Sequence, residues 1–372
     1  MRILFVNLPF AGHTNPTFPL VNALVRSGHQ VSYINSEEWR PKIEACGAQF
    51  IPYRHFPQNP SLQQIKKHCF QAAFETVMSV GHDYEILIYE MLFFPGKEIA
   101  DRLGIPCVRQ FSQPAWNQQT YNTLGKDYRF FNFSSTLIGR QLMNQQARKA
   151  LAMPEKNLLD SLLYEEPNLN LVYLPEAFQP GRKNFGSNYL FIPPEIHIPE
   201  SVPAKTGIPV IYISLGTIVS SKMFCLKCIK AFKDQPVQVF LSTGKVPVEV
   251  LGNLPKNIQA AQFLPQIELL AQADLFITHG GMNSVNEALQ LGVPMLVVPF
   301  LNDQPMNAKQ VVRIGVGERL SPLGLTADKL QKAATNILEN EQLYERMKTL
   351  QTALQNGLKL SDAVAAIEKL KH

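Results

Sequence analysis

His13 is the first residue whose type and setting could do chemistry. It lies in the loop Pro9–Pro16, between a short apolar run and a helix-length segment. The electropositive N-terminus of a helix disfavours the imidazolium form, so a histidine there stays neutral near pH 7 and can act as a general base. The alternative is that His13 only caps the turn, and the residue by itself favours neither interpretation.

The strongest chemical signal runs from Asp274 to Glu287. An apolar run ends at Thr278 and is followed by His279, two glycines and a helix-length segment that carries polar residues in its first turns. Glycines let a ligand approach the backbone, and the N–H groups of a first helical turn bind anions such as a diphosphate. Glu287 follows Asn283 by four residues, so both share a helix face and the carboxylate could accept two ribose hydroxyls. The alternative is an ordinary glycine turn with a helix cap, which the combination of residue types disfavours.

Three further loops carry polar or aromatic residues directly after apolar runs. Asp303 and Gln304 follow one run and can bond sugar hydroxyls, although such a pair is also common in turns. Phe263 and Gln266 follow another and could form a wall for a base, or Phe263 could be a core aromatic. Thr217 closes a hydroxyl and glycine turn after a third.

Apolar runs of strand length alternate with helix-length segments along the chain, which predicts parallel sheets covered on both faces. The first half should hold strands at 2–8, 30–35, 48–52, 85–90, 106–111 and 169–174, with helices at 41–46, 62–80 and 96–103. The second half should hold strands at 210–215, 237–242, 257–263, 275–278 and 295–299, and only helices from Thr326 on. The fold class is therefore α/β, with two doubly wound, Rossmann-like domains expected to face across a cleft, where ligands bind beyond the carboxyl ends of the strands.

The proline-rich stretch Phe191–Pro209 reads as a linker between two domains. We expect an N-terminal domain over 1–200, a second domain over 201–355, and a C-terminal helix over 356–372 that packs back on the N-terminal domain. A length of 372 residues suits two domains.

Composition excludes several classes of protein. The net charge of +5 is too mild for an acidic tail protein and gives little support to nucleic-acid binding. No apolar run reaches the roughly 18 residues that would suggest a membrane span. The 5 cysteines show no disulfide framework, so we expect a cytoplasmic protein. Cys225 and Cys228 form a CxxC in a segment that reads as an amphipathic helix, which favours buried thiols over a zinc site.

On these motifs the chain resembles the family 1 glycosyltransferases of GT-B fold, and in particular the bacterial macrolide-type UDP-glycosyltransferases. The string HGGMNSxxEAL, followed by GVPM and DQ within Phe263–Gln310, is similar to their nucleotide-sugar signature, and the GHTNP loop to their catalytic loop. The resemblance implies that the domain over 1–200 binds the acceptor and the domain over 201–355 binds the nucleotide sugar. It also implies that His13 deprotonates the acceptor and that a UDP-sugar is the co-substrate, without a cofactor. It implies donor-binding roles for His279, Gly281, Asn283, Ser284 and Thr217 at the diphosphate, Glu287 at the ribose, Asp303 and Gln304 at the sugar, and Phe263 and Gln266 at the uracil.

Two residues depart from the family pattern. Phe263 stands where the family usually has tryptophan, which weakens stacking on the base. Glu90 stands where the family has the aspartate that pairs with its histidine. A longer carboxylate can still accept the Nδ1–H bond, and Glu90 is a better candidate than Asp83, which precedes its strand.

The predicted reaction is the inverting transfer of a hexose, with glucose favoured, from a UDP-sugar to a hydroxyl of an apolar acceptor such as a flavonoid, phenol or macrolide. No DxD occurs in the sequence, so no metal site is expected. The acceptor pocket should draw on the aromatic residues between 111 and 133, with Phe111, Trp116, Phe130 and Phe131 as candidates, or these could simply pack a helical insertion. The alternatives are a nucleotide-sugar epimerase, a non-catalytic binding protein of the same fold and a membrane-associated lipid glycosyltransferase.

Overall fold

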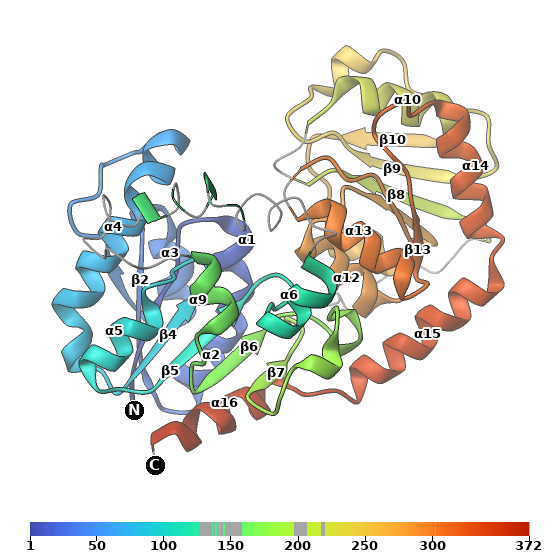
Figure 1. The fold of residues 1–372 in the computed structure, drawn as a ribbon. Helices are drawn as coiled ribbons and strands as arrows, with labels where there is room; N and C mark the ends of the chain where they lie inside the picture. The colour runs from blue at the N-terminus through green and yellow to red at the C-terminus, as the bar shows by residue number, and fades with distance from the viewer. Residues whose placement is uncertain are drawn as a thin grey trace. The chain divides into compact units, whose positions relative to one another are not determined.

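The structure is a computed structural model in which residues 1–125, 136, 138–139, 141, 144–145, 158–196, 207–216, 220–301 and 303–371 are described. The chain divides into two compact units (Figure 1). The N-terminal unit comprises Met1–Pro194 and Leu358–His372, and the C-terminal unit comprises Glu195–Gly357.

A parallel sheet forms the centre of the N-terminal unit. Its strand order is β3-β2-β1-β4-β5-β6-β7, and every neighbouring pair is parallel. The strands are β1 (Arg2–Val6), β2 (Gln30–Asn35), β3 (Gln49–Pro52), β4 (Ile86–Glu90), β5 (Cys107–Phe111), β6 (Leu169–Val172) and β7 (Tyr189–Phe191). The chain fills the sheet from β1 toward β3 and then restarts beside β1 with β4, so the order reverses between β1 and β4.

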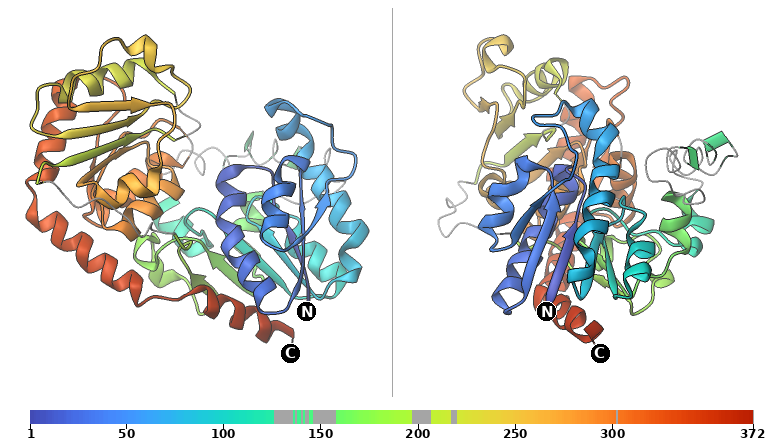
Figure 2. Two further views of the ribbon diagram at one scale, coloured as in Figure 1. Left: turned by 180° about the vertical axis from the view of Figure 1, so that it is seen from behind. Right: turned by 90° about the vertical axis from the view of Figure 1, so that its left-hand side faces the viewer.

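Strand β1 shows why this sheet needs helices on both faces. Ile3 and Phe5 pack into one hydrophobic cluster, while Leu4 and Val6 pack into another. Successive side chains of a strand point to opposite faces, so a strand that is apolar throughout must be covered twice. The first cluster is closed by α2 (Phe18–Arg26), α3 (Arg40–Ala45) and α16 (Leu360–Glu368), and the second by α4 (Leu62–Val80) and α5 (Gly96–Leu103), on the two sides of the strands in Figure 2.

Shorter helices complete the N-terminal unit. The α-helices are α1 (Ala11–Thr14), α6 (Gln118–Leu124) and α9 (Leu158–Tyr164). The 3₁₀ turns are η1 (Asn15–Thr17), η2 (Glu37–Trp39), η3 (Gly81–Asp83), η5 (Glu176–Phe178), η6 (Arg182–Asn184) and η8 (Lys369–Lys371). Ser61 begins α4 with a capping box, in which its hydroxyl accepts from the Gln64 N–H and the Gln64 side chain accepts from the Ser61 N–H.

The C-terminal unit repeats the same plan with the strand order β10-β9-β8-β11-β12-β13, again parallel throughout. Its strands are β8 (Val210–Ser214), β9 (Gln238–Ser242), β10 (Ile258–Ala261), β11 (Leu275–Thr278), β12 (Met295–Val297) and β13 (Gly317–Arg319). Its helices are α10 (Lys222–Phe232), η7 (Val248–Leu251), α11 (Gln266–Gln272), α12 (Met282–Leu291), α13 (Gln304–Arg313), α14 (Ala327–Leu338) and α15 (Glu341–Gln355). Here the order reverses between β8 and β11.

The predicted fold class is confirmed, and two short strands are additions to it. β7 and β13 have only three residues each, too few to show a period, and both take their place at a sheet edge beside a longer neighbour. The predicted linker Phe191–Pro209 begins with the last residue of β7, and its residues 197–206 lie outside the described part of the chain.

The cysteines agree with the amphipathic helix predicted around the CxxC. Cys225 and Cys228 lie on α10 and are buried, and all 5 cysteines are free thiols. Burial raises the pKa of the Cys225 thiol to about 11, which keeps it protonated near pH 7. Among the described residues, no helix is both long and apolar enough to cross a membrane.

The C-terminal helix α16 belongs to the core of the N-terminal unit. Leu360, Ala363, Val364 and Ile367 share the cluster that holds Leu20 and Leu24 of α2. At the end of α16 the Glu368 Oε1 lies 3.0 Å from His29 Nε2. The last residues of the chain therefore complete a core that the first residues begin.

This packing predicts that Ile367→Ala destabilises the N-terminal unit selectively. Ile367 is fully buried, and removing a buried Ile side chain costs about 2–5 kcal/mol. Pulsed hydrogen exchange across a urea gradient should show peptides from β1 and β2 unfolding at lower urea, with peptides from β8 and β11 unchanged. Ser361→Ala, at an exposed position of α16, is the matched control. An equal shift in both units would contradict the prediction.

Candidate active site

The two reversals of strand order locate the candidate residues of each unit. In an open parallel sheet, the loops that leave neighbouring strands on either side of a reversal diverge and leave room for a ligand. The loop after β1 carries His13, and β4 ends at Glu90. The loop after β11 carries His279, and β8 is followed by Gly216. Residues far apart in sequence thus reach the same edge of each sheet.

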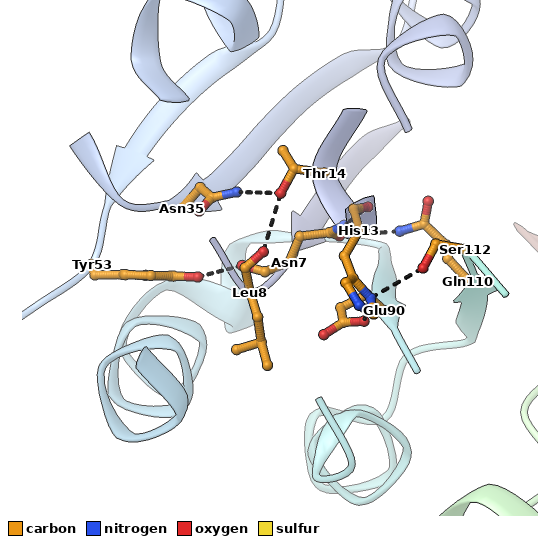
Figure 3. A network of polar contacts seen from close by, with 9 residues as sticks. All are labelled: Asn7, Leu8, His13, Thr14, Asn35, Tyr53, Glu90, Gln110 and Ser112. Atoms are coloured by element: carbon orange, nitrogen blue, oxygen red, sulfur yellow. Dashed lines mark hydrogen bonds and ion pairs between the residues drawn. The ribbon is translucent and has the colours of Figure 1, made fainter. Parts of the chain in front are cut away.

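His13 and Glu90 form a direct contact in the N-terminal unit. His13 Nδ1 lies 3.0 Å from Glu90 Oε2, and the two side chains are 12% and 3% exposed (Figure 3). A carboxylate can only accept, so the Nδ1 proton of His13 is the one donated to it. This leaves the lone pair of the neutral ring on Nε2, the arrangement that a general base needs. The prediction that Glu90 can contact His13 despite its extra methylene fits this geometry.

Ser112 is a second neighbour of the same ring nitrogen. It directly follows β5, which pairs with β4, and its hydroxyl oxygen lies 3.1 Å from His13 Nδ1 (Figure 3). A charged carboxylate is the stronger acceptor, so the serine hydroxyl is the secondary partner. Together Glu90 and Ser112 restrict the orientation of the ring from two strands.

The backbone of the histidine loop is held by Asn7, which directly follows β1. Asn7 Nδ2 donates to the carbonyl of His13 at 3.0 Å, and Gln110 Nε2 donates to Asn7 Oδ1 at 3.3 Å. The Tyr53 hydroxyl donates to the Asn7 carbonyl, and Thr14 Oγ1 donates to the Leu8 carbonyl at 3.1 Å (Figure 3). Because these groups are buried, each unpaired one would be costly, so the network fixes one conformation of the loop.

In the C-terminal unit the ring of His279 packs between Gly216 and Gly281. A Cβ at Gly216 would stand 2.7 Å from His279 Cε1, and a Cβ at Gly281 would stand 2.6 Å from Nε2. Only glycine leaves room for the ring at both positions. The ring is 7% exposed, and this burial lowers the pKa of His279 to about 4. His279 is therefore neutral near pH 7 and can donate one N–H.

Helix α12 begins beside this histidine. Its N-cap is Gly281, which has no side chain to accept from the first-turn N–H groups. These donors, which include those of Asn283 and Ser284, are the groups that bind an anion at a helix N-terminus. The predicted cluster of His279, Gly281, Asn283 and Ser284 is thus brought together at one turn.

Gln266 connects α11 to α12. Its Nε2 donates to Ser284 Oγ at 3.2 Å and to Glu287 Oε2, and its Oε1 accepts from the Tyr212 hydroxyl at 3.3 Å. Burial raises the pKa of Glu287, while the bond from Gln266 acts in the opposite direction. The structure therefore joins Gln266 to Glu287, two residues to which the family resemblance assigns different parts of the donor.

The remaining donor candidates lie at loop ends of the same unit. Phe263 lies between β10 and α11 and is 69% exposed, so it is not a core aromatic. Asp303 is the N-cap of α13, and its carboxylate makes no cap bond. Gln304 is buried, and its Oε1 accepts from the N–H groups of Phe300 and Leu301 at 2.8 and 2.9 Å. The side-chain oxygen of Gln304 thus holds the backbone of the loop that precedes α13. Thr217 lies outside the described residues.

The aromatic candidates for the acceptor are buried where they are described. Phe111 is fully buried, with its ring centroid 6.4 Å from that of Tyr189, and Trp116 is 3% exposed. Both side chains agree better with the alternative that the sequence left open, which is packing inside the unit. Phe130 and Phe131 lie outside the described residues. Within the described ranges, no group of three or more His, Cys, Asp or Glu side chains could hold a metal ion.

Sequence reasoning missed several residues of these networks. Asn7, Gln110 and Ser112 are polar residues within or just after buried strands, and that interruption of an apolar run was the available signal. Asn307 gave no such signal, because it lies inside an amphipathic helix and its partners come from two other segments.

Comparisons with known proteins agree with this architecture. Residues 198–356 match the family described as UDP-glucoronosyl and UDP-glucosyl transferase. The chain is 30% identical to the NDP-glycosyltransferase YjiC of Bacillus subtilis (strain 168), over 99% of this chain and 96% of that protein. It is 24% identical to the oleandomycin glycosyltransferase of Streptomyces antibioticus, over 95% of this chain and 87% of that protein. The crystal structure of the kitacinnamycin glycotransferase shares the fold, with a TM-score of 0.86, 24% identity and coverage of 100% and 99% of the two chains.

The lowered pKa of His279 predicts a pH-dependent stability of the C-terminal unit. Between pH 6.5 and 4 the unfolded chain binds a proton that the folded chain does not, so the free energy of unfolding falls as pH falls through this window. From pH 7.5 to pH 5, wild type should lose about 2 kcal/mol more than His279→Gln. Urea-dependent pulsed hydrogen exchange on β8 and β11 peptides measures the difference. Equal losses in the two proteins would refute a neutral, buried His279.

Proposed function

Because this chain belongs to the family of UDP-glucoronosyl and UDP-glucosyl transferases, we propose that it transfers a hexose from a UDP-sugar to a hydroxyl of an apolar small molecule with inversion at the anomeric carbon. That the chain is a glycosyltransferase follows from its family. The donor, the acceptor and the residue roles below are the proposal. The observation that carries it is the hydrogen bond between His13 and Glu90.

His13 is the proposed general base. Its Nε2 takes the proton from the acceptor hydroxyl as that oxygen attacks the anomeric carbon, while Glu90 holds Nδ1–H and stabilises the imidazolium that forms. The attack forms one C–O bond as the bond to the diphosphate breaks, so an α-linked donor gives a β-linked product. The proton on His13 is then lost to solvent.

The leaving diphosphate is the proposed ligand of the turn at His279. As the glycosidic bond breaks, negative charge develops on the phosphate oxygens, and donors already fixed in place stabilise it without reorganising. The neutral His279 contributes an N–H, and the start of α12 contributes the N–H groups of Gly281, Asn283 and Ser284. Thr217 is the proposed further contact.

The nucleoside and the sugar are assigned to the loops around this turn. Glu287, oriented by Gln266, is proposed to accept the ribose hydroxyls, and the exposed ring of Phe263 is proposed to stack on uracil. Asp303 and Gln304 are proposed to bind the hexose, with glucose favoured. The name of the Bacillus relative specifies an NDP-sugar in general, so the choice of uridine rests on the family and on these residues.

The acceptor is proposed to be a natural product with an apolar ring system. The relatives include a protein named for oleandomycin, and the family supports glycosylation of macrolide or other natural-product type. Phe111 and Trp116 are proposed to pack behind the residues that line the acceptor pocket, since both side chains are buried in the protein. No cofactor or metal ion takes part in the proposed reaction, because the base and the anion site are built from protein groups.

Replacement of His13 provides the sharpest test of the mechanism. His13→Ala should lower kcat by about 10²–10⁴-fold, the usual contribution of a general base, and leave the Kd for UDP unchanged in calorimetric titration. Glu90→Gln should lower kcat less, and the double variant should be no slower than His13→Ala, because the two act as a unit. If the double variant instead loses kcat by the product of the two single losses, or if His13→Ala no longer binds UDP, the histidine has another role.

A panel experiment separates the proposed activity from its alternatives. UDP-glucose and other radiolabelled nucleotide sugars are incubated with flavonoids, simple phenols and macrolides, with and without EDTA. We expect a β-linked glucoside by NMR, formed equally well in EDTA. Epimerised donor without transfer would favour the epimerase, and a loss of transfer in EDTA that Mg²⁺ restores would overturn the metal-independent mechanism.

A further inference from the structure

Asn307 is a buried amide that touches two of the proposed donor loops. It lies in the second turn of α13, four residues after Asp303, and is fully buried. Its Nδ2 donates to Asp303 Oδ2 at 2.8 Å and to the carbonyl of Gly280 at 2.9 Å. An amide nitrogen carries two hydrogens, and these two acceptors use both.

The orientation of this amide is determined by its partners. A flip would bring Oδ1 against the Asp303 carboxylate and the Gly280 carbonyl, two acceptors that it would repel. In the orientation shown, Oδ1 is buried and has no hydrogen-bond partner among the described residues. A leucine of similar volume would avoid that cost, so packing alone does not account for an asparagine at this position.

The first consequence concerns Asp303. An aspartate at an N-cap ordinarily accepts from the N–H groups of the first helical turn, but the Asp303 side chain makes no such bond. Its carboxylate is instead bonded from one side by Asn307. The direction in which the second carboxylate oxygen points is therefore set by a residue that lies behind it on α13.

The second consequence concerns the diphosphate turn. The Gly280 carbonyl is bonded to Asn307, and in a planar trans peptide the N–H of the next residue points the opposite way. Fixing this carbonyl thus fixes the direction of the Gly281 N–H, one of the proposed phosphate donors. A single side chain links the direction of a sugar-binding group to that of a phosphate-binding group.

We propose that Asn307 is a positioning residue that sets Asp303 relative to the diphosphate turn and so determines which hexose the donor site accepts. This inference rests on the proposed role of Asp303 at the sugar. Asn307 itself touches no substrate, and its effect on the sugar passes through Asp303.

Calorimetric titration of the full chain with UDP, UDP-glucose and UDP-galactose tests the proposal without an acceptor. Asn307→Ala should reduce the discrimination between the two UDP-sugars roughly tenfold, the effect of losing a hydrogen bond to a charged group. Asp303→Asn should reduce it similarly, and the double variant should show no further loss, since both changes remove the same interaction. Asn307→Ser, which retains one donor and part of the volume, gives a second measurement if the alanine variant does not fold.

Gln310→Ala is the matched control. Gln310 lies on the same helix and is also buried, at 2% exposure, and its amide nitrogen has no hydrogen-bond partner among the described residues. It should lower the Tm without changing the discrimination. If Gln310→Ala reduces the discrimination as Asn307→Ala does, the effect is one of stability alone and the proposal fails.

The outcomes separate this inference from the proposed function. If Asp303→Asn leaves the discrimination unchanged, both the sugar contact and the positioning role are overturned. Two other results would leave the sugar contact standing and overturn the positioning role. In one, Asp303→Asn reduces the discrimination and Asn307→Ala does not. In the other, both variants reduce the discrimination and their effects multiply in the double variant.

Discussion

The contact between His13 and Glu90 in the N-terminal unit depends on the pairing of β1 with β4. These strands are about eighty residues apart in sequence but adjacent in the sheet, with Val6 opposite Tyr89. The pairing brings the end of β4 beside the loop that leaves β1, and the hydrogen bond between His13 and Glu90 follows from it. The same sheet brings Ser112 from β5, so the contacts of the ring with Glu90 and Ser112 depend on the register of three parallel strands.

A glutamate at this position imposes its own constraint. Glu90 is 2% exposed, and a buried carboxylate is costly unless it is hydrogen-bonded. Oε2 contacts His13, while Oε1 is buried without a hydrogen-bond partner among the described residues. The contact with the histidine ring is therefore the hydrogen bond that the described structure gives this buried side chain. In the proposed reaction the same carboxylate stabilises the imidazolium that forms when His13 takes the proton of the acceptor.

The sequence predicted the fold better than it predicted the contacts within the site. Strand β2 and helix α4 have the predicted bounds because each is long, uniform in pattern and ended by clear signals. His13, His279 and the glycine turn could be found because they follow apolar runs directly. The contacts of Asn307 could not be found in this way, since a hydrogen bond between α13 and the turn after β11 depends on tertiary packing that no local pattern records.

The two units use the same edge of the same kind of sheet in different ways. The N-terminal unit presents side chains, His13, Glu90 and Ser112, held by a buried network of polar groups. The C-terminal unit presents mainly backbone, at a turn whose glycines leave room for His279 and for the start of α12. Backbone donors recognise a diphosphate whatever sugar it carries. If the turn binds the diphosphate as proposed, selectivity for the sugar must come from the few side chains near it. The direction of the Asp303 carboxylate, which Asn307 holds, is then the feature of this unit that can distinguish one sugar from another.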